Sequence, residues 1–239
     1  MKYSSICEIG DRDVNEDSVA CLARGDRWCF VVADGLGGHD KGEVASSIVT
    51  ATFSDEFTES FKSNAGFLAG AFDNAQERIV NAKQKAAEMK TTCVALSIAA
   101  GRFVYGHIGD SRLYHFRRAK LRSRTLDHSV PQMLELSGEI SEDDIRGHPD
   151  RGRLFRAMGD EWDVPRYELS RERKLSGGDA FLLCTDGFWE HIPDAMMTQT
   201  LREAGSAEKW LHAMRDVVLA AGGEVSLDNF SAIAVIIKE

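Results

Sequence analysis

Three apolar runs of the sequence each lead into an aspartate that is followed by a glycine or a serine. These pairs are Asp34-Gly35 after FVVA, Asp110-Ser111 after YGHIG and Asp186-Gly187 after FLLCT. The first and last runs are nearly continuous, which predicts strands covered on both faces. A carboxylate at such an end is partly removed from water and needs a cation or hydrogen-bond donors as partners. No lysine is adjacent in sequence to Asp34 or Asp186.

Two further acidic sites lie beside predicted strands: Glu16-Asp17 in RDVNEDS, and Asp228 in SLDNFSAIAV. An ordinary turn explains any one of these pairs equally well. As a set, however, ionised acids gathered at one end of a sheet would repel one another strongly without a cation. Ligands that are all oxygens favour Mg²⁺ or Mn²⁺ over zinc, and glycine after Asp34 lets a backbone carbonyl approach an ion. The residues therefore predict a divalent metal site of unstated purpose.

The elements that must position these acids follow from the hydrophobic pattern. Short β-like runs occupy residues 4–34, helical patterns cover 42–61 and 64–89, and strands return over 92–126. Residues 127–164 are polar, with two short helical patterns at 130–138 and from the N-cap Ser141. Strands at 167–175 and 179–186, helices at 192–204 and 206–222 and a strand from 229 complete the chain.

Strands and helix pairs in this order do not alternate as βαβ units do, which disfavours a parallel doubly wound sheet. We expect an α+β fold: a four-layer α-β-β-α sandwich in which a helix pair flanks each of two antiparallel sheets. The chain of 239 residues is expected to form one domain, residues 1–239, with four prolines and no linker composition. A connection between strands as long as residues 127–164 more often has a function than serves only to join the strands.

Composition and sequence pattern argue against two classes of binding partner, nucleic acids and membranes. The net charge of −9 argues against nucleic acid, no apolar run approaches the roughly 18 residues of a membrane span, and the N-terminus lacks a secretory pattern. We therefore expect a cytoplasmic protein without nucleic-acid or membrane partners. The five cysteines form no CxxC pair and are expected to be small buried hydrophobes. A cysteine phosphatase loop at Cys184 is disfavoured because Glu190 occupies the position where such a loop has an arginine.

Six segments, in order, resemble the type 2C family of metal-dependent serine/threonine protein phosphatases, particularly its short bacterial members. They are RDVNEDS, VVADGLGGHDKGEVAS, TTCVALSIAAGRFVYGHIGDSRLY, LDHSVPQMLELSGEI, FLLCTDGFWEHI and LDNFSAIAV. Each motif alone is weak, but the ordered set covers essentially the whole chain. The resemblance implies a helix-flanked β-sandwich with two Mn²⁺ or Mg²⁺ ions at one end and a third, weaker ion.

Carried over by motif, the resemblance implies a role for each acid. Asp34 would bridge two ions, Asp186 and Asp228 would complete the shell of one, and Glu16 and the carbonyl of Gly35 would serve the other. Asp110 would hold the third ion with Asp186. Asp17 would not bind an ion directly but would contact the residues that do. Arg12 would bind the substrate phosphate, for which its planar fork is suited. By itself Arg12 reads as a surface arginine, and only its spacing before Asp17 indicates this role.

The implied reaction is hydrolysis of phosphoserine and phosphothreonine monoesters by a water that two ions activate. Animal relatives carry a histidine, proposed as the general acid, where this chain has Leu36. The nearby His39 is equally well explained by a structural role. We therefore assign no protein general acid and expect a metal-bound water to act in its place. Residues 128–164 correspond to the family's flap, where Ser129, Arg146 and Arg153 are candidates for contacting the protein substrate; an exposed structural role is nearly as good an interpretation. By analogy, the partners are phosphorylated proteins and a bacterial Ser/Thr kinase that the enzyme, expected to be a monomer, opposes.

Two other functions remain open from the sequence. A phosphatase-like binding module would usually have lost metal aspartates, which this chain retains. A carboxylate-metal nuclease or phosphodiesterase shares the binuclear chemistry, but the acidic net charge disfavours it.

Overall fold

Two antiparallel sheets stack face to face in the computed structural model, which describes residues 1–36, 41–59, 61, 63–83, 89–223 and 226–238. The first sheet has the order β1 (Lys2–Glu8), β12 (Phe230–Ile236), β11 (Asp179–Cys184), β7 (Arg112–Arg117) and β8 (Lys120–Arg124). The second has the order β10 (Arg173–Lys174), β6 (Arg102–Ile108), β5 (Cys93–Ala99), β3 (Arg27–Leu36) and β2 (Asp17–Arg24). Two short strands extend it, β4 (Lys90–Thr91) beside β3 and β9 (Glu168–Leu169) beside β6.

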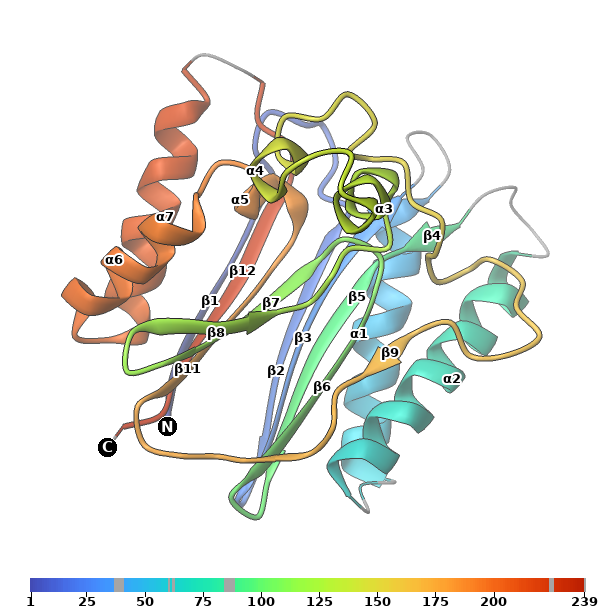
Figure 1. The fold of residues 1–239 in the computed structure, drawn as a ribbon. Helices are drawn as coiled ribbons and strands as arrows, with labels where there is room; N and C mark the ends of the chain where they lie inside the picture. Colours follow the sequence, from blue (N-terminus) through green and yellow to red (C-terminus); the bar gives the residue numbers. More distant parts are fainter. Residues whose placement is uncertain (37–40, 60, 62, 84–88, 224–225, 239) are drawn as a thin grey trace.

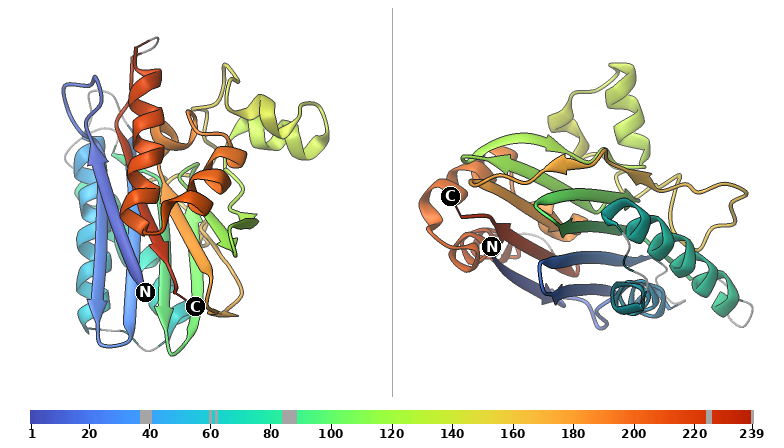
Figure 2. Two further views of the ribbon diagram at one scale, coloured as in Figure 1. Left: turned by 90° about the vertical axis from the view of Figure 1, so that its left-hand side faces the viewer. Right: turned by 90° about the horizontal axis from the view of Figure 1, so that it is seen from below.

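Helix pairs cover the outer faces of both sheets (Figures 1 and 2). Helices α1 (Gly42–Glu59) and α2 (Asn64–Lys83) pack on the second sheet, and α6 (Asp194–Ala204) and α7 (Ala207–Ala221) pack on the first. The expected four-layer α-β-β-α arrangement is therefore confirmed. None of the described helices is long and apolar enough to cross a membrane.

Alternation along β3 explains its unbroken apolar run. Phe30 and Val32 belong to the apolar cluster between the two sheets, whereas Val31 and Ala33 belong to the cluster beneath α1 and α2. Both faces of the strand are thus buried, as a near-continuous apolar run predicts. The cysteines follow the expectation only in part: Cys29, Cys93 and Cys184 are buried, but Cys21 is partly exposed and Cys7 is exposed on β1.

Antiparallel pairing brings the acid-bearing ends together. The C-terminal ends of β3, β6 and β11 lie at the same end of the sandwich as the beginnings of β2 and β12. The short helices α3 (Val130–Ser137), α4 (Glu142–Ile145) and α5 (Asp186–Trp189) lie at this end, and both termini lie at the other (Figure 1). Residues 128–155 leave the body and return through an antiparallel bridge between Ser129 and Leu154 (Figure 2).

Candidate metal centre

Asp34 lies directly opposite Asp17 in the β2–β3 ladder. Two threonines fix its backbone: Oγ1 of Thr92 accepts from the Asp34 N–H at 3.1 Å, and Oγ1 of Thr91 donates to the Asp34 carbonyl at 2.8 Å. The prediction that the strand ends on Asp34 is wrong by two residues. The strand continues through Gly35 and Leu36 because these residues pair with β4.

Gly35 is required here by close packing of the backbone. A Cβ atom on Gly35 would lie 2.3 Å from the carbonyl carbon of Gly42, the first residue of α1, and a Cβ on Gly42 would lie 2.8 Å from Oε1 of Glu16. The Gly35 N–H also donates to the Glu16 carbonyl at 3.1 Å. The absence of side chains thus lets the beginning of α1, the end of β3 and the Glu16 segment meet.

Asp186 is the first residue of α5, just after β11, and Asp228 lies just before β12. The N–H of Gly187 donates to Oδ1 of Asp186 at 2.7 Å, and the N–H of Asn229 donates to Oδ1 of Asp228 at 2.8 Å. A Cβ atom on Gly187 would lie 2.2 Å from the Asn229 carbonyl oxygen, so the first turn of α5 and the segment before β12 touch through this glycine. These hydrogen bonds engage Oδ1 of each carboxylate, and Oδ2 of Asp228 accepts from Nη2 of Arg12.

The acids raise one another's pKa. Burial raises the pKa of Asp34 well above its usual range, and the charges of Asp186, Asp17 and Asp110 add to this. Burial and then Asp186 raise the pKa of Asp110 well above its usual range and the pKa of Asp17 to about 7. Burial also raises the pKa of Asp186 and of Glu16. These carboxylates have come close enough to destabilise one another's charge, which a divalent cation would relieve.

Two buried carboxylate oxygens in this cluster have no hydrogen-bond partner among the described residues: Oδ1 of Asp17 and Oδ1 of Asp110. Oδ2 of Asp17 is bonded, since it accepts from Oγ1 of Thr185 at 3.0 Å. Buried polar atoms are rarely left unpaired without a functional reason. The unpaired oxygens, the raised pKa values and the all-oxygen composition fit hard divalent cations such as Mg²⁺ or Mn²⁺.

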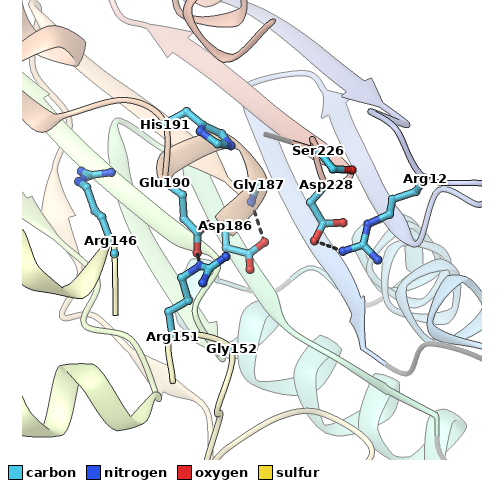
Figure 3. Close-up of a pocket in the computed structure, with 11 residues that line it drawn as sticks. Arg12, Arg146, Arg151, Gly152, Asp186, Gly187, Glu190, His191, Ser226 and Asp228 are labelled. Carbon is cyan, nitrogen blue, oxygen red and sulfur yellow. Dashed lines mark hydrogen bonds and ion pairs between the residues drawn. The ribbon is translucent and has the colours of Figure 1, made fainter. Parts of the chain in front are cut away.

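Arg12 lies at the edge of this cluster. Its Nη2 atom donates to Oδ2 of Asp228 at 2.7 Å, and 58% of its side chain is exposed. A cavity of about 680 Å³ opens beside the pair (Figure 3). It is lined by Arg12, Arg146, Gly147, Arg151, Gly152, Asp186, Gly187, Glu190, His191, Ser226 and Asp228.

Glu190 and Arg151 form a charged pair in the cavity. Neither residue was predicted from the sequence to belong to the site. Nε of Arg151 lies 2.8 Å from Oε1 of Glu190, and the two side chains meet beside Asp186 (Figure 3). Burial, followed by the charge of Asp186, raises the pKa of Glu190 to about 7. The pair links the excursion between β8 and β9 to the C-terminal end of α5, the helix that begins with Asp186.

The three residues expected to contact a protein substrate differ in accessibility. Ser129 does not fit that role, because it is 1% exposed at the bridge that closes the excursion. Arg146 lines the cavity but is fixed inward: it donates to the Trp189 carbonyl and lies 2.6 Å from Oδ1 of Asp194. Arg153 is 71% exposed and pairs with Asp150, so it is accessible. His39 lies outside the described residues.

Other polar residues, unnoticed in the sequence, hold the ligands in place. Oδ1 of Asn229 accepts from the Glu16 N–H at 2.8 Å, and its amide group donates to the carbonyls of Ile9 and Val14. Thr92 links Asp34 to the Asp110 loop, because its Oγ1 lies 2.6 Å from Oγ of Ser111. Local sequence gave no signal for these contacts, since each joins segments that are far apart in the chain.

A second cluster of potential ligands, His107, His128 and Glu168, does not suit a metal ion. Nδ1 of His128 accepts from the Gly109 N–H at 3.1 Å, so its Nε2 carries the proton and donates to Glu168. Nε2 of His107 is bonded to the Leu126 carbonyl at 2.8 Å, and the two imidazole rings are stacked. This arrangement is a hydrogen-bonded structural network beside the Asp110 loop.

Comparisons with known proteins agree with this geometry. The family model described as "Protein phosphatase 2C" matches residues 8–228. The serine/threonine protein phosphatase PstP of Mycobacterium tuberculosis is 32% identical over 93% of this chain, which spans only 43% of that relative. The serine/threonine phosphatase stp of Listeria innocua is 30% identical over 94% of this chain and 90% of its own length.

Among solved structures, the catalytic domain of PstP in complex with two manganese ions superposes with a TM-score of 0.84 at 27% identity. The match covers 99% of this chain and 98% of that one. The similarity thus extends over the two sheets, the four flanking helices and the end of the sandwich where the acids gather.

Proposed function

Since this chain belongs to the protein phosphatase 2C family, we propose that it is a metal-dependent phosphatase that hydrolyses phosphoserine and phosphothreonine monoesters on proteins. The observation that carries the proposal is the convergence of buried, mutually repelling carboxylates beside Arg12 at one end of the sandwich. The chain spans less than half of its mycobacterial relatives, so the proposal concerns the activity of this domain.

The proposed site divides its residues between ion binding and phosphate binding. Asp34 would hold the Mn²⁺ or Mg²⁺ ions of the main site, and Asp110 and Asp186 would hold a further, weaker one. Asp17 supports the ligands from behind, consistent with its burial and its bond to Thr185. The remaining ligands are Glu16, the Gly35 carbonyl, Asp186 and Asp228.

When bound, such ions supply a water of lowered pKa and neutralise charge on the phosphoryl oxygens. The chain itself positions the substrate. Arg12 presents a planar set of donors at the cavity edge beside Asp228, where it can bind two phosphoryl oxygens. The cavity beside it receives the phosphorylated side chain, and the Arg151–Glu190 pair is part of its lining.

We further propose that residues 1–239 form one phosphatase domain in which residues 128–164 are a flap over the site. Of the flap arginines, Arg153 is the one exposed to a protein partner, while Arg146 anchors the flap. The cellular role proposed by analogy is to oppose a bacterial Ser/Thr kinase, acting as a monomer in the cytoplasm.

The decisive experiment supplies purified protein with phosphothreonine and phosphoserine peptides and Mn²⁺. Phosphate release that a chelator abolishes, and that Asp186→Asn nearly eliminates, would support the proposal. A bis-ester assayed in parallel separates a phosphodiesterase from a monoesterase. If no phosphopeptide releases phosphate in the presence of metal, while the protein still binds partner proteins, the chain is a binding module and the proposal is wrong.

A further inference from the structure

Trp189 lies where three parts of the proposed site meet. It is the last residue of α5, which begins with Asp186, and it is 2% exposed. Its indole N–H donates to the backbone carbonyl of Asp110 at 3.0 Å. One short helix therefore carries a proposed ligand at its beginning and, at its end, a side chain that fixes the backbone of another.

Two arginines restrain the indole. The guanidinium carbon of Arg112 lies 3.4 Å from the ring centroid, and Arg112 is itself fixed by bonds of 2.8 and 2.6 Å to Asp127. Arg146 of the flap lies 5.5 Å from the centroid and donates to the Trp189 carbonyl. The ring cannot turn without breaking these contacts, so it is a rigid support.

The residue before Asp110 is fixed from another direction. The His128 N–H donates to the Gly109 carbonyl at 3.0 Å, and the Gly109 N–H donates to Nδ1 of His128 at 3.1 Å. The backbone is thus bonded on both sides of Asp110, whereas its buried Oδ1 has no partner among the described residues. The position of this carboxylate is set by its backbone contacts.

We propose that Trp189 is a positioning residue that holds the Asp110 carboxylate in place for the weaker third ion and connects it to the flap through Arg146. This inference rests on the proposed function for the identity of the ion. The indole touches no reacting atom; it acts through the Asp110 backbone. Loosening the indole N–H bond should weaken ion binding at Asp110 and leave the other ions bound.

The chain contains a matched control. Trp210, on α7, is fully buried and donates its indole N–H to the carbonyl of Met197 on α6 at 3.1 Å. Replacing either tryptophan with phenylalanine keeps an aromatic ring and removes one N–H bond. A purely structural role predicts the same consequences for Trp189→Phe and Trp210→Phe.

The test titrates each purified variant with Mn²⁺ and counts free ion by electron paramagnetic resonance, together with a thermal melt. We expect both variants to lose similar thermal stability, and only Trp189→Phe to weaken the weakest class of Mn²⁺ site, by about fivefold, the equivalent of one hydrogen bond. Asp110→Asn should abolish that class, and Trp189→Phe should cause no further loss in its background.

Equal Mn²⁺ binding by Trp189→Phe, Trp210→Phe and the unmodified chain would overturn the inference, as would a titration in which Asp110→Asn removes no class of ion. If Trp189→Phe does not fold, Arg146→Gln provides the test, because it leaves the indole in place and removes the contact to the flap. It should weaken the same class by about twofold, and an unchanged affinity would count against the inference. Binding without phosphatase activity would refute the proposed function while still deciding the role of Trp189.

Discussion

Nη2 of Arg12 lies 2.7 Å from Oδ2 of Asp228, so the proposed phosphate-binding arginine forms an ion pair with a proposed metal ligand. Both side chains are about half exposed, at 58% and 46%. A guanidinium group has five N–H donors, so the bond to Asp228 leaves others free for phosphate. Among the described residues, Asp228 is the one side chain bonded to Arg12, so this pair alone places the proposed phosphate-binding group beside a proposed ligand.

Arg12→Ala should lower kcat/KM for a phosphothreonine peptide by about 30- to 100-fold, because a charge-assisted, two-pronged contact to phosphate is lost. The kcat/KM of Arg12→Lys should lie between those of Arg12→Ala and the unmodified chain, since lysine keeps the positive charge but lacks the planar guanidinium group. Steady-state kinetics at saturating Mn²⁺ would measure both effects.

Arg78→Ala is the matched control for this prediction. Arg78 also pairs with an aspartate, Asp55, at 2.7 Å and is 49% exposed, but it lies on α2, remote from the site. The kcat/KM of Arg78→Ala should stay within about twofold of the value for the unmodified chain. An equal loss in both variants would show that Arg12 acts only on stability.

Asp34→Asn should separate stability from function. Removing one charge from the repelling cluster should raise the free energy of unfolding in chelator by about 1 kcal/mol. The same change should abolish phosphate release and much of the stabilisation by excess Mn²⁺, which is about 3 kcal/mol at 100 times Kd. Urea denaturation with chelator and with Mn²⁺ would measure both.

Asp55→Asn serves as its comparison, because it removes a carboxylate that is 52% exposed on α1. It should leave activity and Mn²⁺ stabilisation unchanged. If Asp34→Asn proved less stable than the unmodified chain in chelator, the repulsion inferred from the raised pKa of Asp34 would be wrong.

The layer order was predictable because it depends on patterns within single elements. The apolar run that includes Phe30 and Val32 requires cover on both faces: the opposite sheet covers one face, and α1 and α2 cover the other. Asp34, Asp110 and Asp186 could be picked out because each follows an apolar run; β3 and β6, which β5 separates in one antiparallel sheet, end at the same edge. The family resemblance then supplied the individual roles, which the residues alone left open.

Contacts between distant segments were not predictable. Asn229 supports Glu16, and Thr92 supports both Asp34 and Ser111, through hydrogen bonds that depend on how the two sheets are placed. Ser129 was a candidate because the resemblance places it in the flap, yet the bridge to Leu154 buries it. Composition reports the average environment of a segment and not the direction of one side chain.

Gly35→Ala should destabilise the fold by about 2–4 kcal/mol, because the new Cβ atom would lie 2.3 Å from the backbone of Gly42. The displacement of Gly35 should also raise the Mn²⁺ concentration needed for half-maximal activity. Gly70→Ala is the control: it lies within α2 with no atom within 4 Å of the new Cβ, and should stabilise by up to about 1 kcal/mol. Similar melting temperatures for the two variants would contradict the close packing.

Asp179 should make the fold sensitive to acid at a point away from the proposed metal centre. It is fully buried and accepts bonds from Nε of Arg117 at 2.7 Å and from Nε2 of His115 at 3.0 Å. Burial alone would raise the pKa of Asp179, but the bonds from Arg117 and His115 outweigh it and hold the pKa below its usual range. The folded state therefore favours the ionised carboxylate.

A lowered pKa in the folded state contributes stability that is present above the unfolded value of about 4 and is lost as the pH falls below it. Asp179→Asn should therefore cost about 2 kcal/mol at pH 7, and the difference from the unmodified chain should shrink between about pH 4 and pH 3. Urea denaturation at several pH values measures this difference, from which the other acids cancel because both proteins share them. Asp150→Asn, at an exposed pair with Arg153, should show little effect at any pH, and a cost for Asp179→Asn that stays constant down to pH 3 would refute the assignment.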